Sequence, residues 1–504
     1  MTLGRRLKPQ SESPFESGEA VTLQFEGRTI QGYDNEPVAA ALLAAGIRVF
    51  GRSIKYHRPR GPVCLRGHCS GCLMRVDGIP NVRTCETLCR SGMVVERQSG
   101  WPSSGFDIFR SIDWLTPDRL DHHGMFTASS SVNRLAARFI RKLSGLGEPP
   151  TSDPPAAVGL NRFSSEVVVI GGGNAGLSAA MALAESGHEV VLFEASNHRG
   201  GRLLDASCCI DDPARGLLTG WSVFNTWKSK WENTAGIEIH INTPVLAVYS
   251  GDHLEVLASN PKQTFLVDAK RLVVCCGAYE QIPLFANNDL PGLFGIRAFD
   301  KLISAYGVVP GEPVALVGDS NQTLQLAGLL SDRNVGLAGV VTNQRDGELV
   351  ERLKGKNIPI FHGRKLVRAR GSKWLDRIEL APQDQTTADL VLDCKSCAIE
   401  GPPSPAYELA HHAGCRVTFR SSSGYHVVTD KQGQTSHSQI FAAGHCAESA
   451  TSALALNHGQ RAGLACAISL SDDPKLTKRL DELLKQEQDA QSESDCPLVG
   501  GEHG

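Results

Sequence analysis

Residues 166–202 contain the stretch that most constrains what this chain can fold into. A continuous apolar run, Val167–Ile170, is followed by a glycine-rich turn, a helical apolar pattern and a second apolar run, Val190–Phe193. The pattern predicts a βαβ unit with a G-x-G-x-x-G turn, in which Gly171 permits the sharp turn. Gly173 lets backbone amides approach a pyrophosphate, and Gly176 lets the helix lie close to the strand. A dinucleotide would then place its phosphates at the helix N-terminus.

The residues after this unit indicate which dinucleotide binds. Glu194 ends the second apolar run, where a carboxylate can accept hydrogen bonds from ribose hydroxyls, which favours FAD or NAD over NADP. Arg199-Gly200-Gly201-Arg202 resembles the second glycine motif of flavoproteins with two dinucleotide-binding domains. The motif favours FAD, and the alternative is a glycine-rich turn with two solvated arginines.

Length and charge set wider bounds. A chain of 504 residues is too long for one hydrophobic core, so several domains are expected. The net charge of −3 gives no support for nucleic-acid binding or for general membrane binding. No apolar run is long enough for a transmembrane helix, and no apolar core follows the N-terminal arginines as in a signal peptide. A cytoplasmic location is therefore the default expectation.

A cysteine-rich loop predicts an iron–sulfur centre ahead of the dinucleotide unit. Two short strand patterns and a helix pattern precede Cys64-x4-Cys69-x2-Cys72, an order typical of a small β-grasp domain. The spacing matches that of plant-type [2Fe–2S] proteins, and Cys85 is the expected fourth ligand. Cys89 is the alternative fourth ligand. Zinc is the alternative metal, although zinc sites usually pair two C-x-x-C knuckles and this loop has one.

Two further segments carry weaker signals. Residues 132–146 of the connector can form a basic amphipathic helix, which packs against a neighbouring domain or subunit or, alternatively, attaches the chain peripherally to a membrane. Cys394 and Cys397 form a C-x-x-C pair, for which we favour ordinary burial over redox chemistry.

A second Rossmann-like unit is expected over residues 311–330, but its turn is degenerate. After the strand Val314–Val317 the chain reads Gly318-Asp319-Ser320, without the second and third glycines, and Asp319 stands where phosphates need positive potential. We therefore expect the unit to keep its architecture without binding a pyridine nucleotide. Two later segments resemble the strand ends of flavoproteins with two dinucleotide-binding domains, so Gly277 and Gly444-His445 are expected to pass close to the first cofactor. In those proteins an aspartate commonly contacts the flavin ribityl chain, and here His445 takes its place.

Taken together, these motifs resemble the α-subunits of heteromeric FAD/[2Fe–2S] amine and amino-acid dehydrogenases. The group includes the α-subunits of opine oxidase, D-hydroxyproline dehydrogenase, cyanide-forming glycine dehydrogenase and sarcosine oxidase. Local matches lie at Gly51-Arg52-Ser53, Cys276–Glu280 and Leu290-Pro291-Gly292. We expect neither the cysteine-rich C-terminal domain of some members nor the folate-binding half of sarcosine oxidase here, and in length and order the sequence most resembles the opine oxidase α-subunit.

The resemblance implies an α/β fold. A β-grasp [2Fe–2S] ferredoxin-like domain would come first in the chain, followed by a flavoprotein part with two dinucleotide-binding domains. The expected parts are an N-terminal extension (1–19), the β-grasp domain (20–100), a connector (101–163), the FAD domain (164–288 and 435–472), the inserted pseudo-NAD domain (289–434) and a charged tail (473–504). The expected cofactors are FAD and a [2Fe–2S] cluster. Two alternatives stay open: FMN at a subunit interface, and another adenine nucleotide in the Rossmann site.

The resemblance also implies a function. The chain would conduct electrons from a flavin-containing β-subunit, which oxidises the amine, to a quinone or other acceptor, and no residue here is expected to be catalytic. Opines of the octopine and nopaline type are the predicted substrates, with D-hydroxyproline and glycine as alternatives. Two other classes stay open: a self-sufficient NAD(P)H-dependent reductase that feeds an oxygenase, and a scaffold without working cofactor sites.

Overall fold

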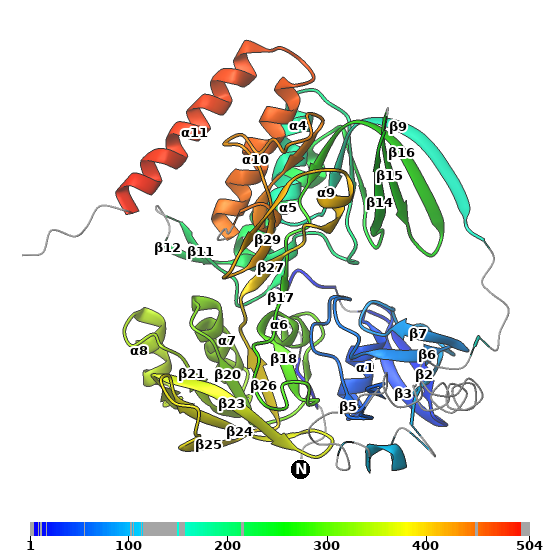
Figure 1. Ribbon diagram of the computed structural model, residues 1–504, viewed down its shortest axis with the longest axis vertical. Helices are drawn as coiled ribbons and strands as arrows, with labels where there is room; N and C mark the ends of the chain where they lie inside the picture. Colours follow the sequence, from blue (N-terminus) through cyan, green and yellow to red (C-terminus); the bar gives the residue numbers. More distant parts are fainter. Residues whose placement is uncertain are drawn as a thin grey trace, which may run out of the picture. The chain divides into compact units, whose positions relative to one another are not determined.

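The computed structural model describes residues 5–494, except 9, 11–12, 17, 55, 101–102, 104, 112, 114–148, 151–156, 213–215, 252 and 449–451. The chain divides into two compact units (Figure 1). The first comprises Met1–Ala156, Asp205–Ser207 and Glu280–Pro402, and the second comprises Ala157–Leu204, Cys208–Tyr279 and Pro403–Gly504. The connector segment 132–146, predicted as an amphipathic helix, lies outside the described residues.

A five-stranded β-grasp sheet opens the first unit, in the order β3-β2-β8-β6-β7. Its strands are β2 (Ala20–Phe25), β3 (Arg28–Tyr33), β6 (Leu73–Val76), β7 (Ile79–Arg83) and β8 (Val94–Glu96), with α1 (Val38–Ala44) beside them. In β2, Leu23 and Phe25 are buried while their neighbours face outward, the alternation of a half-buried strand. Helix α1 is buried from Val38 to Leu43, and its alanines allow a close approach to the sheet.

The inserted part of the first unit contains a five-stranded parallel sheet in the order β18-β26-β20-β21-β22. Its elements are β18 (Leu293–Gly295), α6 (Ile296–Ser304), β20 (Val314–Val317), α7 (Asn321–Asp332), β21 (Leu337–Val341), α8 (Glu348–Gly355), β22 (Ile360–Phe361) and β26 (Ser396–Ile399). An antiparallel sheet of β23 (Arg364–Gly371), β24 (Leu375–Pro382) and β25 (Leu390–Asp393) joins it. The Rossmann-like architecture expected here is therefore present.

Within this unit the β-grasp domain and the inserted domain are joined through a continuous hydrophobic core. The N-terminal strand β1 (Arg5–Arg6) pairs with β19 (Val308–Val309) of the inserted part. The Gly295 amide donates to the carbonyl of Val63, next to the cysteine loop, at 3.1 Å. The cysteine loop is thereby held against the start of α6.

A seven-stranded sheet forms the centre of the second unit, in the order β13-β10-β9-β16-β15-β14, with β30 also paired to β16. The strands are β9 (Gly159–Ile170), β10 (Val190–Phe193), β13 (Ile237–His240), β14 (Val245–Ser250), β15 (Leu254–Ser259), β16 (Gln263–Val274) and β30 (Ile440–Ala442). The pairs β10–β9, β9–β16 and β16–β30 are parallel. The segments that follow these four strands therefore meet at one edge of the sheet.

Helices cover this sheet and close its edge. They are α4 (Asn174–Glu185), α5 (Gly220–Asn233), α9 (Glu408–His412), α10 (Ser452–Ile468) and α11 (Pro474–Ser494), with small pairs β11 (Cys209–Asp212)–β12 (Gly216–Thr219), β17 (Ala278–Glu280)–β27 (Pro403–Pro405) and β28 (Val417–Arg420)–β29 (Gly424–Val427). A Cβ on Gly459 of α10 would lie 2.0 Å from the carbonyl oxygen of Ala175. The contact between α10 and α4 therefore requires glycine at this position.

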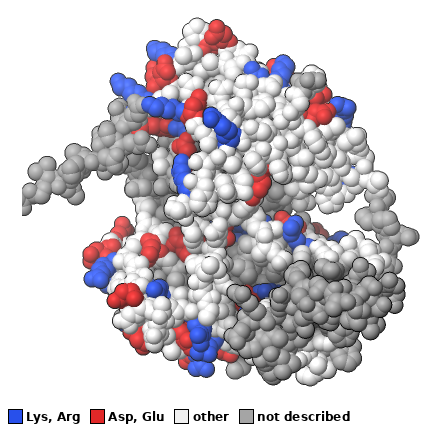
Figure 2. Space-filling model, in the orientation of Figure 1, with Lys and Arg blue, Asp and Glu red and all other residues white. Residues whose placement is uncertain are grey.

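On the face shown in Figure 2, basic and acidic side chains are interspersed, in keeping with the small net charge of −3. In the part of the chain that the structure describes, no helix combines the length and apolar character needed to cross a bilayer.

Candidate cofactor-binding sites

The glycine turn of the second unit has the geometry that a bound dinucleotide needs. Gly171 adopts a φ of 103°, and its amide donates to the carbonyl of Phe193 at 2.8 Å. Gly173 is the N-cap of α4. A Cβ on Gly176 would lie 1.7 Å from the carbonyl oxygen of Gly171, so only glycine fits there. The N-terminus of α4 is thus brought against the end of β9, where its amides can hold a phosphate.

Glu194 and the second glycine motif lie against this turn. The Glu194 carboxylate accepts hydrogen bonds from the amides of Gly172, at 2.6 Å, and Ser196, at 2.7 Å. The Gly200 amide donates to the carbonyl of Gly172 at 2.7 Å. A Cβ on Gly201 would lie 2.7 Å from the Cα of Gly173, so the two glycine motifs touch. The structure therefore brings together residues that the sequence separates into two motifs.

Arg202 and His445 meet at the same edge of the sheet. Arg202 Nη1 lies 3.1 Å from His445 Nε2. A guanidinium can only donate, so this contact requires a neutral imidazole with its proton on Nδ1.

Two glycines flank the place where a flavin would approach. Gly277 and Gly444 adopt φ values of 73° and 77°. A Cβ on Gly277 would meet nothing within 4 Å, whereas one on Gly444 would lie 3.0 Å from the Cβ of Ala175. Open space beside Gly277 and free-standing backbone amides at the start of α4 are the features that a flavin dinucleotide site requires. In this site Arg202 and His445 would contact the cofactor, and Glu194 would contact its ribose.

The cluster cysteines stand in two pairs within the first unit. The hydrogen bond between the thiols of Cys64 and Cys69 raises the pKa of Cys64 and lowers that of Cys69 to about 5. A second hydrogen bond joins Cys72 and Cys85, raising the pKa of Cys85 and lowering that of Cys72. Charge interactions also link Cys72 with Cys69 and Cys85 with Cys64, so the four sulfurs lie in one neighbourhood, as the four ligands of a [2Fe–2S] cluster must.

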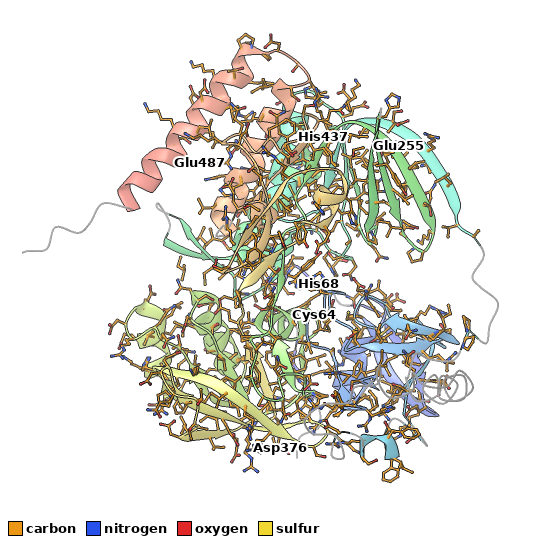
Figure 3. The ribbon with its side chains drawn as sticks, viewed as in Figure 1. Cys64, His68, Glu255, Asp376, His437 and Glu487 are labelled. Atoms are coloured by element: carbon orange, nitrogen blue, oxygen red, sulfur yellow. The ribbon has the colours of Figure 1, made fainter. Side chains whose placement is uncertain are left out.

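The loop backbone also directs amides at the sulfurs. The amide of Cys69 donates to Cys64 Sγ at 3.4 Å, and the amides of Gly67 and Gly71 donate to the sulfurs of Cys85 and Cys69. Gly67 has a φ of 74°, and a Cβ on Gly71 would lie 2.2 Å from the carbonyl oxygen of Gly61. This cradle fits a cluster of negatively charged sulfur atoms. Cys64 and His68 of the loop are labelled in Figure 3.

Cys89 lies apart from the two thiol pairs. Its amide donates to the carbonyl of Glu36 at 2.9 Å, and its sulfur faces Gly32. Burial, with the nearby charge of Glu36, raises the pKa of its thiol to about 12. These contacts favour Cys85 over Cys89 as the fourth ligand.

The second Rossmann-like turn is closed by a carboxylate that sequence analysis missed. Glu400 Oε2 accepts hydrogen bonds from the Ser320 amide, at 3.0 Å, and from Thr323 Oγ1, at 2.8 Å, at the start of α7. Asp319, on the same turn, accepts the Asn343 amide at 2.6 Å. In a nucleotide-binding turn a phosphate would accept these hydrogen bonds, and here the carboxylate of Glu400 takes that place. An acid directly after the apolar strand Ser396–Ile399 is the signal that could have identified Glu400.

The other cysteine groups have the character of buried, unreactive thiols. Burial raises the pKa of Cys394 to about 12 and that of Cys397 well above its usual value. The pKa values of Cys275 and Cys276 are raised in the same way, and that of Cys446 is raised to about 11. Thiolates are the reactive form, so these residues lack the activation of redox cysteines.

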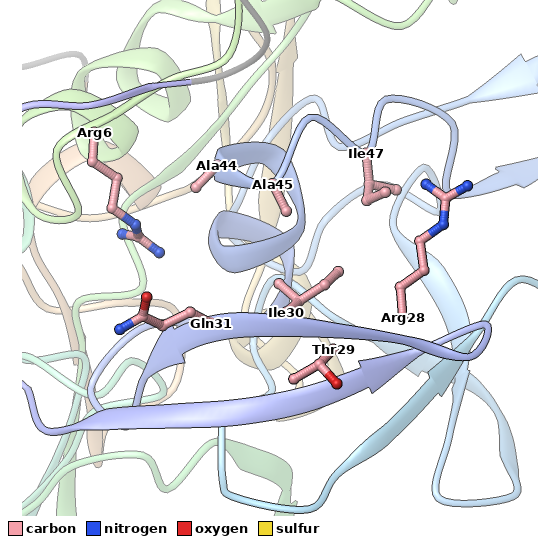
Figure 4. A pocket seen from close by; sticks show the side chains of 8 residues that line it. All are labelled: Arg6, Arg28, Thr29, Ile30, Gln31, Ala44, Ala45 and Ile47. Atoms are coloured by element: carbon pink, nitrogen blue, oxygen red, sulfur yellow. The ribbon is translucent and has the colours of Figure 1, made fainter.

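A cavity of about 390 Å³ lies beside α1 and β3 (Figure 4). Its walls combine the apolar side chains of Ile30 and Ile47 with two arginines, Arg6 and Arg28. Arg6 is already paired with Glu36 at 2.6 Å. None of the predicted cluster ligands lines the cavity, so it is separate from the cluster site.

Two family models match the chain. Residues 18–100 match the model of the 2Fe-2S iron-sulfur cluster binding domain. Residues 165–463 match the model of the pyridine nucleotide-disulphide oxidoreductase family. The chain belongs to this family. The pyridine nucleotide-disulphide oxidoreductase fold behind a ferredoxin-like domain confirms the predicted fold class and supports FAD and [2Fe–2S] as the cofactors.

Relatives of this chain include proteins named as enzyme subunits. The chain is 25% identical over 413 residues to the sarcosine oxidase subunit alpha of Rhizobium meliloti (strain 1021), covering 78% of this chain and 41% of the relative. It is 34% identical over 79 residues to hydrogen cyanide synthase subunit HcnA of Pseudomonas aeruginosa, covering 16% of this chain and 75% of the relative. The predicted resemblance to α-subunits of heteromeric FAD/[2Fe–2S] dehydrogenases is confirmed, although the chain spans less than half of the sarcosine oxidase subunit.

Solved structures support the fold. The L-proline dehydrogenase of P. horikoshii matches with a TM-score of 0.66 and 19% identity, over 95% of this chain and 79% of that one. The thioredoxin reductase of T. acidophilum matches with a TM-score of 0.50 and 18% identity, over 60% of this chain and 98% of that one. These matches concern the order and type of domains; the boundaries and ligand residues given above stay predictions.

Proposed function

We propose that this chain is the electron-transferring subunit of a heteromeric flavin-dependent dehydrogenase acting on the C–N bond of a secondary amine or amino acid. One observation carries the proposal: the same chain combines a cysteine loop whose amides point at its sulfurs, an open dinucleotide edge and a self-closed second nucleotide turn. The two open sites are suited to carrying electrons, and the proposal assigns amine oxidation to a partner.

The reaction itself would take place on a partner subunit. Loss of a hydride and a proton from the CH–NH unit leaves an imine, and addition of water to the imine splits it into an amine and a carbonyl compound. A flavin supplies the chemistry that accepts an electron pair and passes electrons on singly, which a one-electron cluster requires. This chain's residues would hold the flavin and the cluster.

Opines are the proposed substrates. Oxidation of an opine at its secondary amine and hydrolysis of the imine would give an amino acid and a 2-oxo acid. The similarity to a sarcosine oxidase α-subunit supports a secondary amine, and the similarity to hydrogen cyanide synthase subunits keeps glycine as the alternative. D-Hydroxyproline is a further candidate substrate.

The proposed acceptor is a quinone rather than a pyridine nucleotide. Glu400 occupies the helix N-terminus at which the phosphates of NAD would bind, and its negative charge would repel them. The same contact argues against the NAD(P)H-dependent reductase. The proposal also includes FMN at the interface with a flavin-containing β-subunit. It places the chain in the cytoplasm, with peripheral attachment at the inner face of the membrane.

The test is anaerobic absorption spectroscopy of the purified chain, alone and with its presumed β-subunit. Opines, D-hydroxyproline, sarcosine and glycine are added in turn, followed by NADH. We expect an opine to bleach the flavin and cluster bands only when the partner is present. Bleaching by NADH with the chain alone would replace the proposal with the reductase, and absence of both chromophores would replace it with the scaffold.

A further inference from the structure

A buried ion network adjoins the cysteine loop within the first unit. Arg66, in the loop, donates from Nη2 to Asp205 Oδ1 at 3.0 Å. The other oxygen of Asp205 accepts from Arg297 Nε at 2.8 Å. The side chains of Asp205 and Arg297 are 2% and 12% exposed. One buried carboxylate is therefore shared by two arginines, a geometry in which solvent screens the charges weakly.

A second layer of contacts fixes Asp205 in place. Asp300 is fully buried and accepts the amides of Ala206, at 3.2 Å, and Ser207, at 2.8 Å. The Arg297 amide donates to Glu280 Oε1 at 3.2 Å. The short segment 205–207 is thus held by its backbone, and Asp205 can move little. Its carboxylate remains between the two guanidinium groups.

The network reaches the cluster ligands through Arg66. This residue follows Cys64 by two positions in the cysteine loop, and its backbone amide donates to the Cys64 sulfur. Reduction of a [2Fe–2S] cluster adds one negative charge. Nearby fixed charge and hydrogen bonds to the sulfurs are the means by which a protein sets the potential of such a cluster.

We propose that Arg66, Asp205 and Arg297 form a positioning network that sets the reduction potential of the [2Fe–2S] cluster. This inference rests on the proposed function, because it assumes that the loop holds that cluster. The two arginines favour the reduced cluster by their positive charge. The negative charge of Asp205 disfavours the reduced cluster, while its hydrogen bonds hold both arginines in position. Loss of an arginine charge and loss of the Asp205 charge therefore shift the potential in opposite directions.

The test is an EPR-monitored redox titration of the full-length, cluster-loaded chain. Arg66→Gln is expected to lower the ratio of reduced to oxidised cluster at a fixed potential by about tenfold, which for a one-electron couple is about 59 mV. Asp205→Asn is expected to raise that ratio, and Arg66→Lys, which keeps the charge, to lie closer to the unaltered chain. Arg28→Gln removes an exposed arginine from the same domain and is expected to leave the ratio unchanged.

The outcomes separate the network from the proposed function. If the unaltered chain binds iron without the [2Fe–2S] signal, the proposed function fails before the network is tested. If the signal is present but Arg66→Gln and Asp205→Asn shift the potential in the same direction or not at all, the network is refuted. If Arg66→Gln does not load, Arg297→Gln, expected to lower the ratio, and Asp205→Asn decide the question.

Discussion

Glu400 provides a direct test of the closed second nucleotide turn. Its carboxylate oxygen accepts two hydrogen bonds at the start of α7, from the Ser320 amide and from Thr323 Oγ1. Hydrogen bonds to a charged group contribute about 1.5–3 kcal/mol, against about 0.5–1.5 kcal/mol for neutral pairs. Glu400→Gln keeps an oxygen acceptor but removes the charge, so two bonds together lose about 2 kcal/mol. Partial exposure of Glu400 reduces this to about 1.4 kcal/mol.

Hydrogen exchange measures this loss locally. A change of about 1.4 kcal/mol is tenfold in an equilibrium constant, so amides at the start of α7 should exchange about ten times faster in Glu400→Gln. Peptides covering residues 318–326, analysed by mass spectrometry, report that rate. Glu348→Gln is the matched control, because Glu348 lies in the first turn of the neighbouring helix α8. It should leave the α7 peptides unchanged.

The reasoning fails under either of two results. Exchange in Glu400→Gln within twofold of the unaltered chain would show that the carboxylate does not stabilise this turn. Binding of NADH to the unaltered chain at micromolar concentration, measured by its fluorescence, would show that Glu400 does not close the site.

Three further predictions concern the cluster, the dinucleotide turn and pH. Cys85→Ser should abolish the visible cluster absorption while Cys89→Ser preserves it; the reverse pattern, with iron content measured alongside, would transfer the ligand role to Cys89. Gly176→Ala should remove bound FAD and destabilise its unit by about 3 kcal/mol, since the new methyl meets a backbone oxygen; full retention of FAD in the purified variant would contradict the turn geometry. Burial raises the pKa of Asp300 from 3.8 to about 6, so its stabilising contribution is present at low pH and is lost as pH rises through 6. Asp300→Asn should flatten that part of the stability curve between about pH 4 and 6 in thermal unfolding, and an unchanged slope would exclude Asp300 as its source.

The glycine turn and the first cluster cysteines could be predicted because their chemistry is local. Gly171, Gly173 and Gly176 are set by the steric demands of one turn. Cys64, Cys69 and Cys72 are set by the path of one loop. Neighbouring residues in the sequence carry the whole signal at these sites, so no tertiary information is needed to find them.

Contacts between distant segments could not be predicted in the same way. Asp205 meets Arg66, and Glu400 meets Ser320, only because the fold of the first unit brings the segments together. The sequence also left open whether Cys85 or Cys89 completes the ligand set, since the two lie only four positions apart after the loop. Spatial pairing of Cys85 with Cys72, which no spacing rule encodes, is what now favours Cys85.

The first part of β9 shows a different limit. Residues 159–165 pair with β16, yet most of them are exposed and show no regular apolar alternation. Their strand conformation comes from the neighbouring strand rather than from burial of their own side chains. The apolar run from Val167 onward was visible in the sequence because it is buried on both faces.

Reconstitution with the presumed β-subunit tests the central claim most directly. The measurement is the absorbance of flavin and [2Fe–2S] cluster during anaerobic addition of an opine to the chain alone and to the complex. The account predicts no change with the chain alone and bleaching of both chromophores in the complex. Equal bleaching without the partner, or bleaching by NADH alone, would contradict it.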